Sequence, residues 1–274
     1  MPAVREAVAR ALAEDLLPMG DITAALIPVD VQVRAEIIAR EEGVLAGRLC
    51  VNETFAQVDP AVVVTWSLDD GEELEAGAHI ASVEGPLPSV LSAERTALNF
   101  LCHLSGVAST TRRFVRAAAG QARIRDTRKT TPGLRALEKA AVAAGGATNH
   151  RFGLFDAILI KENHAALAGG VGEAVRKARA HASEVPLEVE CRTLEEVDEA
   201  LTAGAPQILL DNMTTDQLRQ AVERVGGRAH LEASGGVTIE TLGEIAATGV
   251  NFISVGALTH SAPALDLSLI LEPV

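Results

Sequence analysis

The sequence predicts an α/β protein in which a strand-rich first part precedes a parallel α/β barrel. The 274 residues exceed the length of one average domain. After Gly120, short apolar runs alternate with alanine-rich helical stretches, as expected of βα units on a parallel sheet. Charged residues close most of these runs, which is where barrel enzymes carry their chemistry.

The N-terminal residues predict an amphipathic helix rather than a targeting segment. Residues 1–17 lack a cleavable hydrophobic core, and they carry Glu6, Glu14 and Asp15, which transit peptides avoid. No stretch reaches the roughly 18 uninterrupted apolar residues that a membrane-spanning helix needs. We therefore expect a cytoplasmic protein that has no membrane partner.

The residues that follow predict antiparallel strands. Apolar and polar residues alternate from Val31 to Ile37, and a second strand-like run extends from Ala61 to Trp66. Turn signals at Asp70-Gly71 and Gly85-Pro86 separate such runs. This pattern is typical of a sheet with one face buried.

Two helices are expected next. Residues 92–104 form an apolar helical pattern that Ser92 would cap, and a second helix is predicted over residues 107–119. Because composition and periodicity change here, we place a domain boundary near residue 106. The predicted domains are residues 1–106 and residues 107–274.

Six apolar runs in the second part are interpreted as parallel strands. They cover residues 122–124, 157–160, 187–189, 208–210, 229–231 and 252–255. Lys161, Glu190, Asp211 and Glu232 close four of them, and Ser254 lies in the last. Since the carboxyl ends of parallel strands meet at one edge, we expect these side chains to converge.

Strand alternation indicates which residues face inward. Gln207 shares a face with Asp211, Glu188 shares one with Glu190, and Glu232 shares one with Ser234. If these faces point into a barrel, its mouth is lined with charge. A doubly wound open sheet is the alternative, but no G-x-G-x-x-G sequence follows a first strand.

Composition limits the classes of partner. The net charge of −13 argues against nucleic acid as a ligand. Cys50, Cys102 and Cys191 are odd in number and lack metal-binding spacing, so we expect them to be buried apolar side chains. A positive pocket in such an acidic chain would select a small anion.

A basic cluster is the first candidate for function. It comprises Arg128, Lys129, His150, Arg151 and Lys161. Arginine binds carboxylate or phosphate through two parallel hydrogen bonds, while lysine acts as a compact positive charge. Surface salt bridges could explain any one of these residues. They explain the whole cluster at strand ends less well, so an anion-binding site is predicted.

An acidic pair and two glycine-rich turns complete the candidate site. Glu190 and Asp211 could hold ribose hydroxyls, bind Mg²⁺ or stabilise a developing cation, and they could also pair with the neighbouring cations. Ala233-Ser-Gly-Gly236 and Ser254-Val-Gly-Ala257 could bring backbone N–H groups close to a phosphate. Such turns are common, and their occurrence in the last two units favours a phosphate site.

These residues resemble the quinolinate phosphoribosyltransferase family (carboxylating nicotinate-nucleotide pyrophosphorylases), which are type II phosphoribosyltransferases. The resemblance covers nearly the whole chain, with Ala147 standing where the family commonly has a third glycine. The matching motifs are Glu14-Asp15, Gly20-Asp-Ile-Thr23, Glu94-Arg-Thr-Ala-Leu-Asn99, Leu104-Ser-Gly106, Asp126-Thr-Arg-Lys-Thr-Thr-Pro-Gly-Leu134, Gly145-Gly146, Asn149-His-Arg151, Leu159-Ile-Lys-Glu-Asn-His164, Leu187-Glu-Val-Glu190, Leu210-Asp-Asn-Met213, Glu232-Ala-Ser-Gly-Gly236 and Ile253-Ser-Val-Gly-Ala-Leu258. It implies an N-terminal α/β sandwich followed by an incomplete α/β barrel.

The resemblance also implies a role for each residue. Lys161, Glu190 and Asp211 would be catalytic. Quinolinate would be bound by Arg128, Lys129, His150, Arg151 and Lys161, together with Arg95 from the partner subunit of a homodimer. Phosphoribosyl pyrophosphate would be bound by Lys129, Lys161, Glu190, Asp211, Ser234, Gly235, Gly236, Ser254, Val255 and Gly256.

The implied reaction forms nicotinate mononucleotide, a precursor of NAD, with Mg²⁺ at Glu190 and Asp211 and no organic cofactor. The dimer could assemble further.

Three other functions fit part of the sequence. A barrel aldolase would use Lys161 as a Schiff-base nucleophile, but would leave Arg128, His150 and Arg151 without a role. A related phosphoribosyltransferase-like protein of the molybdenum-associated kind would act on another acceptor and would lack the dicarboxylate-binding arginines. A non-catalytic anion-binding module would not need the acidic pair.

Overall fold

The computed structural model describes residues 1–272, and the chain forms two compact units. The first comprises Met1–Arg112, Thr130–Gly146 and the residues from Leu258 onward, and the second comprises Arg113–Lys129 and Ala147–Ala257. The sequence predicts a single boundary near residue 106, whereas each of these units is built from more than one segment of the chain. As a division between functional domains, that boundary stays a prediction.

The first unit contains a four-stranded antiparallel sheet in the order β12-β1-β5-β3; three of its strands lie in the region predicted to be antiparallel, whereas β12 was not predicted. Its strands are β1 (Gln32–Ala39), β3 (Val63–Trp66), β5 (His79–Pro86) and β12 (Leu267–Leu271), and the short strands β2 (Gly43–Val44) and β4 (Glu73–Leu74) pair separately. Val33, Ala35 and Ile37 of β1 are buried. Their burial at every second position reproduces the predicted pattern.

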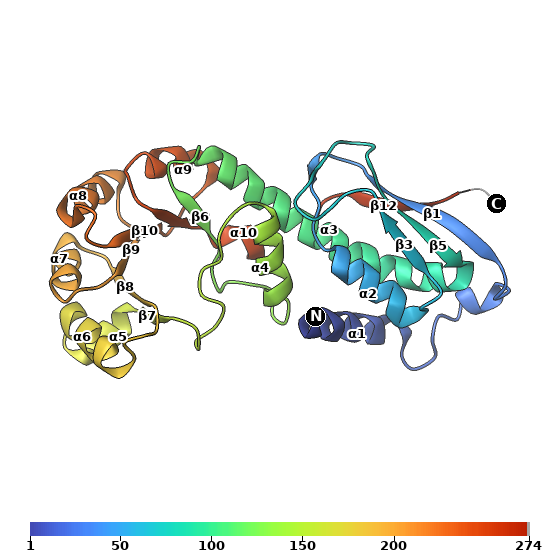
Figure 1. Ribbon diagram of the computed structural model, residues 1–274, viewed down its shortest axis with the longest axis horizontal. Helices are drawn as coiled ribbons and strands as arrows, with labels where there is room; N and C mark the ends of the chain where they lie inside the picture. Colours follow the sequence, from blue (N-terminus) through green and yellow to red (C-terminus); the bar gives the residue numbers. More distant parts are fainter. Residues whose placement is uncertain (273–274) are drawn as a thin grey trace. The chain divides into compact units, whose positions relative to one another are not determined.

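Several helical segments belong to the first unit, and two of them supply part of the core of this sheet. They are α1 (Pro2–Leu16), the 3₁₀ turn η1 (Ala24–Leu26), α2 (Arg48–Val58), α3 (Leu87–Ala117) and α4 (Arg135–Ala144). Phe55 of α2 and Leu101 of α3 share one buried cluster with Ile37. Figure 1 shows α2 and α3 beside the strands of this sheet. The first helix confirms the prediction. Helix α2 was missed because it begins after Gly47 without a side-chain cap, so its start carries no sequence signal.

Helix α3 corrects another prediction. Two helices were expected on either side of residue 106, but Leu87–Ala117 is one helix of 31 residues. Ser105 exchanges hydrogen bonds with the backbone of Ala46 instead of ending a helix. A Cβ atom on Gly106 would lie 2.0 Å from the carbonyl oxygen of Pro263. The Ser-Gly pair therefore marks a close approach of two segments, not a break.

The second unit contains a six-stranded parallel sheet in the order β6-β11-β10-β9-β8-β7. Its strands are β6 (Arg123–Arg125), β7 (Ile158–Ile160), β8 (Leu187–Cys191), β9 (Gln207–Asp211), β10 (His230–Ser234) and β11 (Phe252–Ser254), which confirms all six predicted runs. From β7 to β11 each strand pairs with the next in the chain, so the order never reverses as it would in a doubly wound sheet. The sheet is an incomplete barrel with β6 and β7 as its edges.

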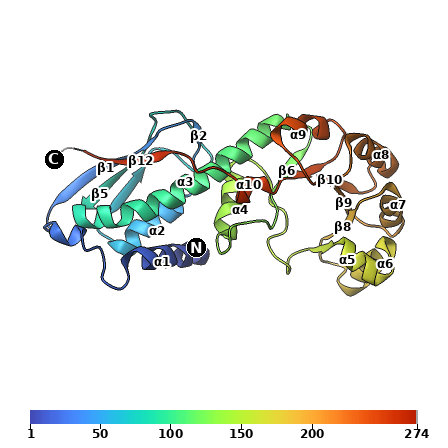
Figure 2. The ribbon, with the colours of Figure 1, turned by 180° about the vertical axis from the view of Figure 1, so that it is seen from behind.

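Helices connect these strands, as the alanine-rich stretches predict. They are α5 (Glu162–Ala168), α6 (Val171–His181), α7 (Leu194–Thr202), α8 (Thr215–Val225) and α9 (Ile239–Ala246), and α10 (Ala257–His260) follows the last strand. Figures 1 and 2 show α6, α7 and α8 on one side of the strands. The opposite face of the sheet is therefore available to polar side chains.

Within residues 1–272, no helix combines the length and apolar character required to cross a membrane. The three cysteines are free, and Cys50 and Cys191 are buried as expected, whereas Cys102 is half-buried. Burial raises the pKa of the Cys50 thiol to about 12 and also raises the pKa of Cys191.

Replacing Gly106 by alanine tests the close approach. Because the added Cβ atom would collide with the carbonyl oxygen of Pro263, we expect Gly106→Ala to lower the free energy of unfolding by about 1–3 kcal/mol. The control is Gly243→Ala in α9, where the new atom meets nothing within 4 Å and a gain of about 0.4–1 kcal/mol is expected. Urea unfolding followed by circular dichroism measures both. Equal stability of Gly106→Ala and the unmodified chain would contradict the packing described.

Candidate active site

A cavity of about 400 Å³ lies at the carboxyl ends of the strands of the second unit. It is lined by Thr127, Arg128, Lys129, His150, Arg151, Leu159, Lys161, Leu209, Asp211, Asn212, Ser234, Gly235, Gly236 and Ser254. Most of the predicted site residues are therefore brought together. The lining does not include Glu190, Val255, Gly256 or Arg95.

Strand register explains this convergence. Asp211 and Ser234 are the last residues of β9 and β10 and lie opposite each other in the sheet. Ser254 ends β11, and Lys161 directly follows β7 and precedes α5. Val255 and Gly256 follow Ser254 directly, while Arg95 lies on α3 in the first unit. The ends of β7, β9, β10 and β11 thus place their side chains at one rim.

The cations at this rim share a strongly positive environment. The pKa of Arg151 is lowered from its ordinary value, first by burial of the Arg151 guanidinium and next by the charge of Arg128. Arg151 also donates from Nη1 to the carbonyl oxygen of Ala157 at 3.2 Å. Two guanidinium groups in one cavity repel each other, and an anion that binds between them offsets this repulsion.

Lys161 and Glu190 form an ion pair, with the Lys161 ammonium donating to Oε2 of Glu190. The Glu190 side chain is only 9% exposed, while that of Lys161 is 45% exposed and reaches the cavity. Glu190 does not line the cavity, and it pairs with a neighbouring cation, which is one of the alternatives left open by the sequence. The pairing presents Lys161 as a cation, which suits an electrostatic role.

The glycine-rich turn after β10 is shaped by a contact that the sequence did not reveal. Gly235 has a φ of +99°, and a Cβ atom there would lie 2.2 Å from Oδ1 of Asn212. Asn212 itself has a φ of 55° and donates from its backbone to the carbonyl oxygen of Ser234 at 2.8 Å. Sequence analysis did not select Asn212 as a site residue, although it directly follows Asp211 and lies in the matching motif Leu210-Asp-Asn-Met213. Glycine at 235 is thus required by both conformation and space.

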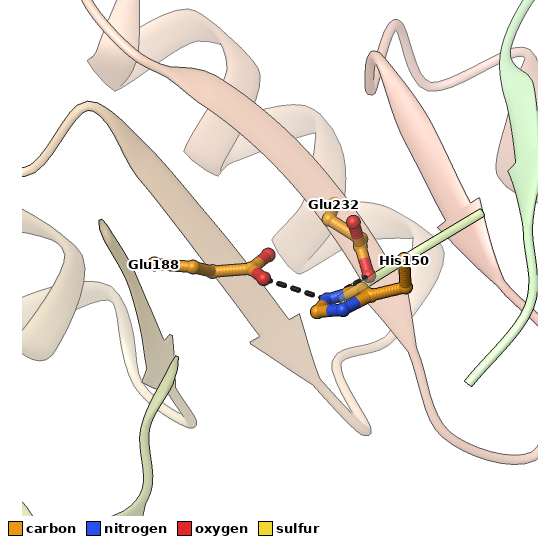
Figure 3. Close-up of side chains that lie close together, drawn as sticks. All are labelled: His150, Glu188 and Glu232. Atoms are coloured by element: carbon orange, nitrogen blue, oxygen red, sulfur yellow. Dashed lines mark hydrogen bonds and ion pairs between the residues drawn. The ribbon is translucent and has the colours of Figure 1, made fainter. Parts of the chain in front are cut away.

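Beneath the rim, charged side chains form a buried network that includes His150 (Figure 3). Nε2 of His150 lies 2.8 Å from Oε2 of Glu188 and 3.5 Å from Oε1 of Glu232. Arg125 donates to Oε2 of Glu232 at 2.6 Å, and Gln207 donates to Glu188 at 2.8 Å and to Glu232 at 3.2 Å. Alternation predicted that the two glutamates and Gln207 face inward, and these contacts confirm it.

Glu232 is the most buried member of this network, with a fully buried side chain. Burial, and next the Glu188 carboxylate, raise the pKa of Glu232, while His150, Ser254 and Arg125 act in the opposite direction. Sequence analysis did not select Arg125, although it directly follows the predicted run 122–124 and is the last residue of β6. Its guanidinium also stacks on the Phe252 ring at 3.4 Å.

Two groups of side chains could be considered for a metal ion. His150, Glu188 and Glu232 offer ligand atoms within 4.8 Å of one another, but the Arg125 guanidinium already pairs with Glu232 and would repel a cation. Asp211 and Glu190 supply the carboxylate oxygens that Mg²⁺ prefers. Asp211 lines the cavity, and Glu190 is engaged by Lys161, so Asp211 fits the ion better.

Comparison with known proteins agrees with the fold. The family described as "Quinolinate phosphoribosyl transferase, C-terminal domain" matches residues 107–270, and its N-terminal domain matches residues 21–105. A "Nicotinate-nucleotide pyrophosphorylase [carboxylating]" of Mycobacterium leprae is 45% identical over 97% of this chain and 96% of its own length. A "Probable nicotinate-nucleotide pyrophosphorylase [carboxylating]" of Bacillus subtilis is 46% identical over 91% of this chain and 87% of its own length.

A solved structure is similar throughout. The nicotinate-nucleotide pyrophosphorylase from Francisella tularensis superposes with a TM-score of 0.96 at 43% identity, covering 99% of this chain and 96% of that chain. Both domains of one family thus match in sequence, and the fold matches over the full length. The chain belongs to the quinolinate phosphoribosyltransferase family.

Proposed function

We propose that this chain transfers the phosphoribosyl group of phosphoribosyl pyrophosphate to quinolinate with decarboxylation. The products are nicotinate mononucleotide, pyrophosphate and carbon dioxide, and the reaction serves NAD biosynthesis. The observation that carries the proposal is the single cavity in which Arg128, Lys129, Arg151 and Lys161 meet Asp211. Both substrates are small polyanions, which a cationic cavity in an acidic chain would select.

The cations divide between the two substrates. Arg128, Arg151 and His150 contact quinolinate, and Lys129 and Lys161 bind both quinolinate and the pyrophosphate side of the donor. Guanidinium groups suit the two carboxylates because their planar donors match carboxylate geometry. The depressed pKa of Arg151 supports this assignment, since a bound carboxylate would relieve the repulsion from Arg128.

The donor's remaining groups are held by the other side of the rim. Glu190 and Asp211 lie by the ribose. The 5′-phosphate is bound by the backbone of the two glycine-rich turns, which comprise Ser234, Gly235, Gly236, Ser254, Val255 and Gly256. Helix α9, which Thr238 caps, begins just after the first of these turns, and a helix N-terminus favours negative charge.

The reaction breaks the bond between the anomeric carbon and the pyrophosphate oxygen, and the electron pair leaves with pyrophosphate. Lys129 and Lys161 offset the charge on that leaving group. The ribose becomes oxocarbenium-like, and the carboxylates of Glu190 and Asp211 stabilise it electrostatically. Mg²⁺ bound by Asp211, with Glu190 as a second donor, would supply further neutralisation of pyrophosphate.

The pyridine nitrogen then forms the new bond to the anomeric carbon, and the ring becomes cationic. Carbon dioxide leaves from the carbon beside that nitrogen, the bonding electrons stay on the ring as a carbanion, and a proton is taken up there. The positive nitrogen stabilises the carbanion. Holding both substrates in line by their anionic groups contributes on the order of several kcal/mol to the rate.

We further propose that the chain forms a homodimer in which Arg95 reaches the quinolinate site of the partner chain, and that the protein is located in the cytoplasm. The resemblance to the family supports the dimer.

The direct test is incubation with quinolinate, phosphoribosyl pyrophosphate and Mg²⁺. We expect nicotinate mononucleotide, pyrophosphate and carbon dioxide in equal amounts. A folded protein that forms no nucleotide from quinolinate would overturn the proposal. Trapping of a carbonyl substrate on Lys161 by borohydride would favour an aldolase instead.

Two substitutions test the site. Arg151→Ala removes a guanidinium from the cavity and Lys161→Ala removes the ammonium, so each should lower kcat/KM by roughly 100-fold or more. Arg219→Ala on the exposed face of α8 is the matched control, and its activity should equal that of the unmodified chain. Near-normal activity of either cavity variant, with an unchanged circular dichroism spectrum, would refute the assigned site.

Mixing two inactive variants tests the shared site. If Arg95 acts across a dimer, then Arg95→Ala subunits mixed with Lys161→Ala subunits form dimers with one intact site. Random mixing of a two-fold symmetric dimer should restore about a quarter of the full activity. Absence of recovery, although subunit exchange is demonstrated by mass spectrometry, would count against a contribution from the partner.

A further inference from the structure

The ring of His150 has both nitrogens engaged inside the second unit. Nδ1 accepts the backbone N–H of Arg151 at 2.7 Å, and Nε2 lies 2.8 Å from Oε2 of Glu188. A backbone N–H can only donate, so Nδ1 carries no proton. The ring's single proton therefore lies on Nε2 and points to the carboxylates, as Figure 3 shows for Glu188 and Glu232. His150 is a neutral imidazole in this arrangement.

We propose that Glu188 is a positioning residue that holds His150 as this Nε2-protonated tautomer, and that the ring in turn fixes the backbone of Arg151. The inference rests on the proposed function, because it says which residues hold the quinolinate-binding residues in place. The positive charge for the substrate then comes from Arg128, Lys129, Arg151 and Lys161, and not from His150.

The surroundings of the ring explain why Glu188 holds this role. Glu232 is farther from Nε2, at 3.5 Å, and its oxygens accept from Arg125, Gln207 and Ser254. Gln207 donates to the other oxygen of Glu188, which aims Oε2 at the ring. Glu188 is thus the principal acceptor for His150, while Glu232 balances the charge of Arg125.

The backbone on either side of the ring is fixed as well. The N–H of His150 donates to Oδ1 of the fully buried Asp126 at 2.7 Å. The N–H of Arg151 donates to the ring, and Nη1 of Arg151 donates to the carbonyl oxygen of Ala157. Loss of the acceptor at Glu188 would release the ring, the Arg151 N–H and finally the guanidinium. Charged groups around His150 include Glu188, Glu232, Asp126 and Arg151, with Arg125 paired to Glu232.

Two substitutions separate the acceptor from the charge. Glu188→Leu removes the acceptor, and we expect the KM for quinolinate to rise on the order of 10- to 100-fold, as for a misplacement of about 1 Å. The KM for phosphoribosyl pyrophosphate should change far less. Glu188→Gln keeps an oxygen in the same place and should raise the KM for quinolinate several-fold less than Glu188→Leu. The control for an added apolar side chain is Glu223→Leu, at an exposed position of α8.

Nitrogen-15 NMR of the substrate-free protein reads the tautomer directly. The chain has 7 histidines, so the His150 signals are identified as those that disappear in His150→Gln. We expect the ring to carry a proton on Nε2 and none on Nδ1 in the unmodified chain and in Glu188→Gln.

A protonated ring or an Nδ1–H tautomer in the unmodified chain would overturn the inference, and so would an unchanged quinolinate KM in a folded Glu188→Leu protein. If Glu188→Leu does not fold, the tautomer in the other two proteins decides. If the unmodified protein makes no nucleotide, the proposed function fails, while the NMR result still judges the positioning of His150 on its own.

Discussion

Charge buried inside the second unit has to be neutralised by the protein itself, and this requirement organises everything at the rim above. Glu188, Glu190 and Glu232 project from the sheet with little or no exposure. An unpaired carboxylate at such a place would cost several kcal/mol. Lys161 pairs with Glu190 and Arg125 pairs with Glu232. Glu188 receives an imidazole N–H and an amide, which are weaker partners than a cation.

This arrangement separates two tasks between two layers of side chains. The lower layer consists of acids and their internal partners, and it fixes the backbone that carries the upper layer. The upper layer presents cations to a cavity that a small anion can enter. The Arg128 and Arg151 guanidinium groups repel each other there, which is tolerable because the layer beneath is acidic. A binding site for polyanions is thus compatible with a net charge of −13.

The sequence was sufficient to predict features that depend on local period. All six parallel strands followed from short apolar runs, because βα units repeat at regular intervals. The prediction that Glu190 and Glu232 close their strands was wrong, because β8 and β10 extend beyond these residues. Features that depend on contacts between distant residues were not predictable. The ring of His150 meets Glu188 across 38 positions, and Gly106 is required by Pro263 rather than by a turn. Helix α2 was not predicted for a different reason: it begins after Gly47, which has no side chain that could cap the helix.

The last strand of the chain has a consequence for how the protein is made. Strand β12 pairs antiparallel with β1, from Leu271 opposite Ala35 to Leu267 opposite Ala39, although the two strands lie far apart in the sequence. Until β12 has been synthesised, this edge of β1 has open N–H and C=O groups, a template for unwanted strand addition. Because the whole parallel sheet is translated between the two strands, a chaperone that shields β1 would act during that interval.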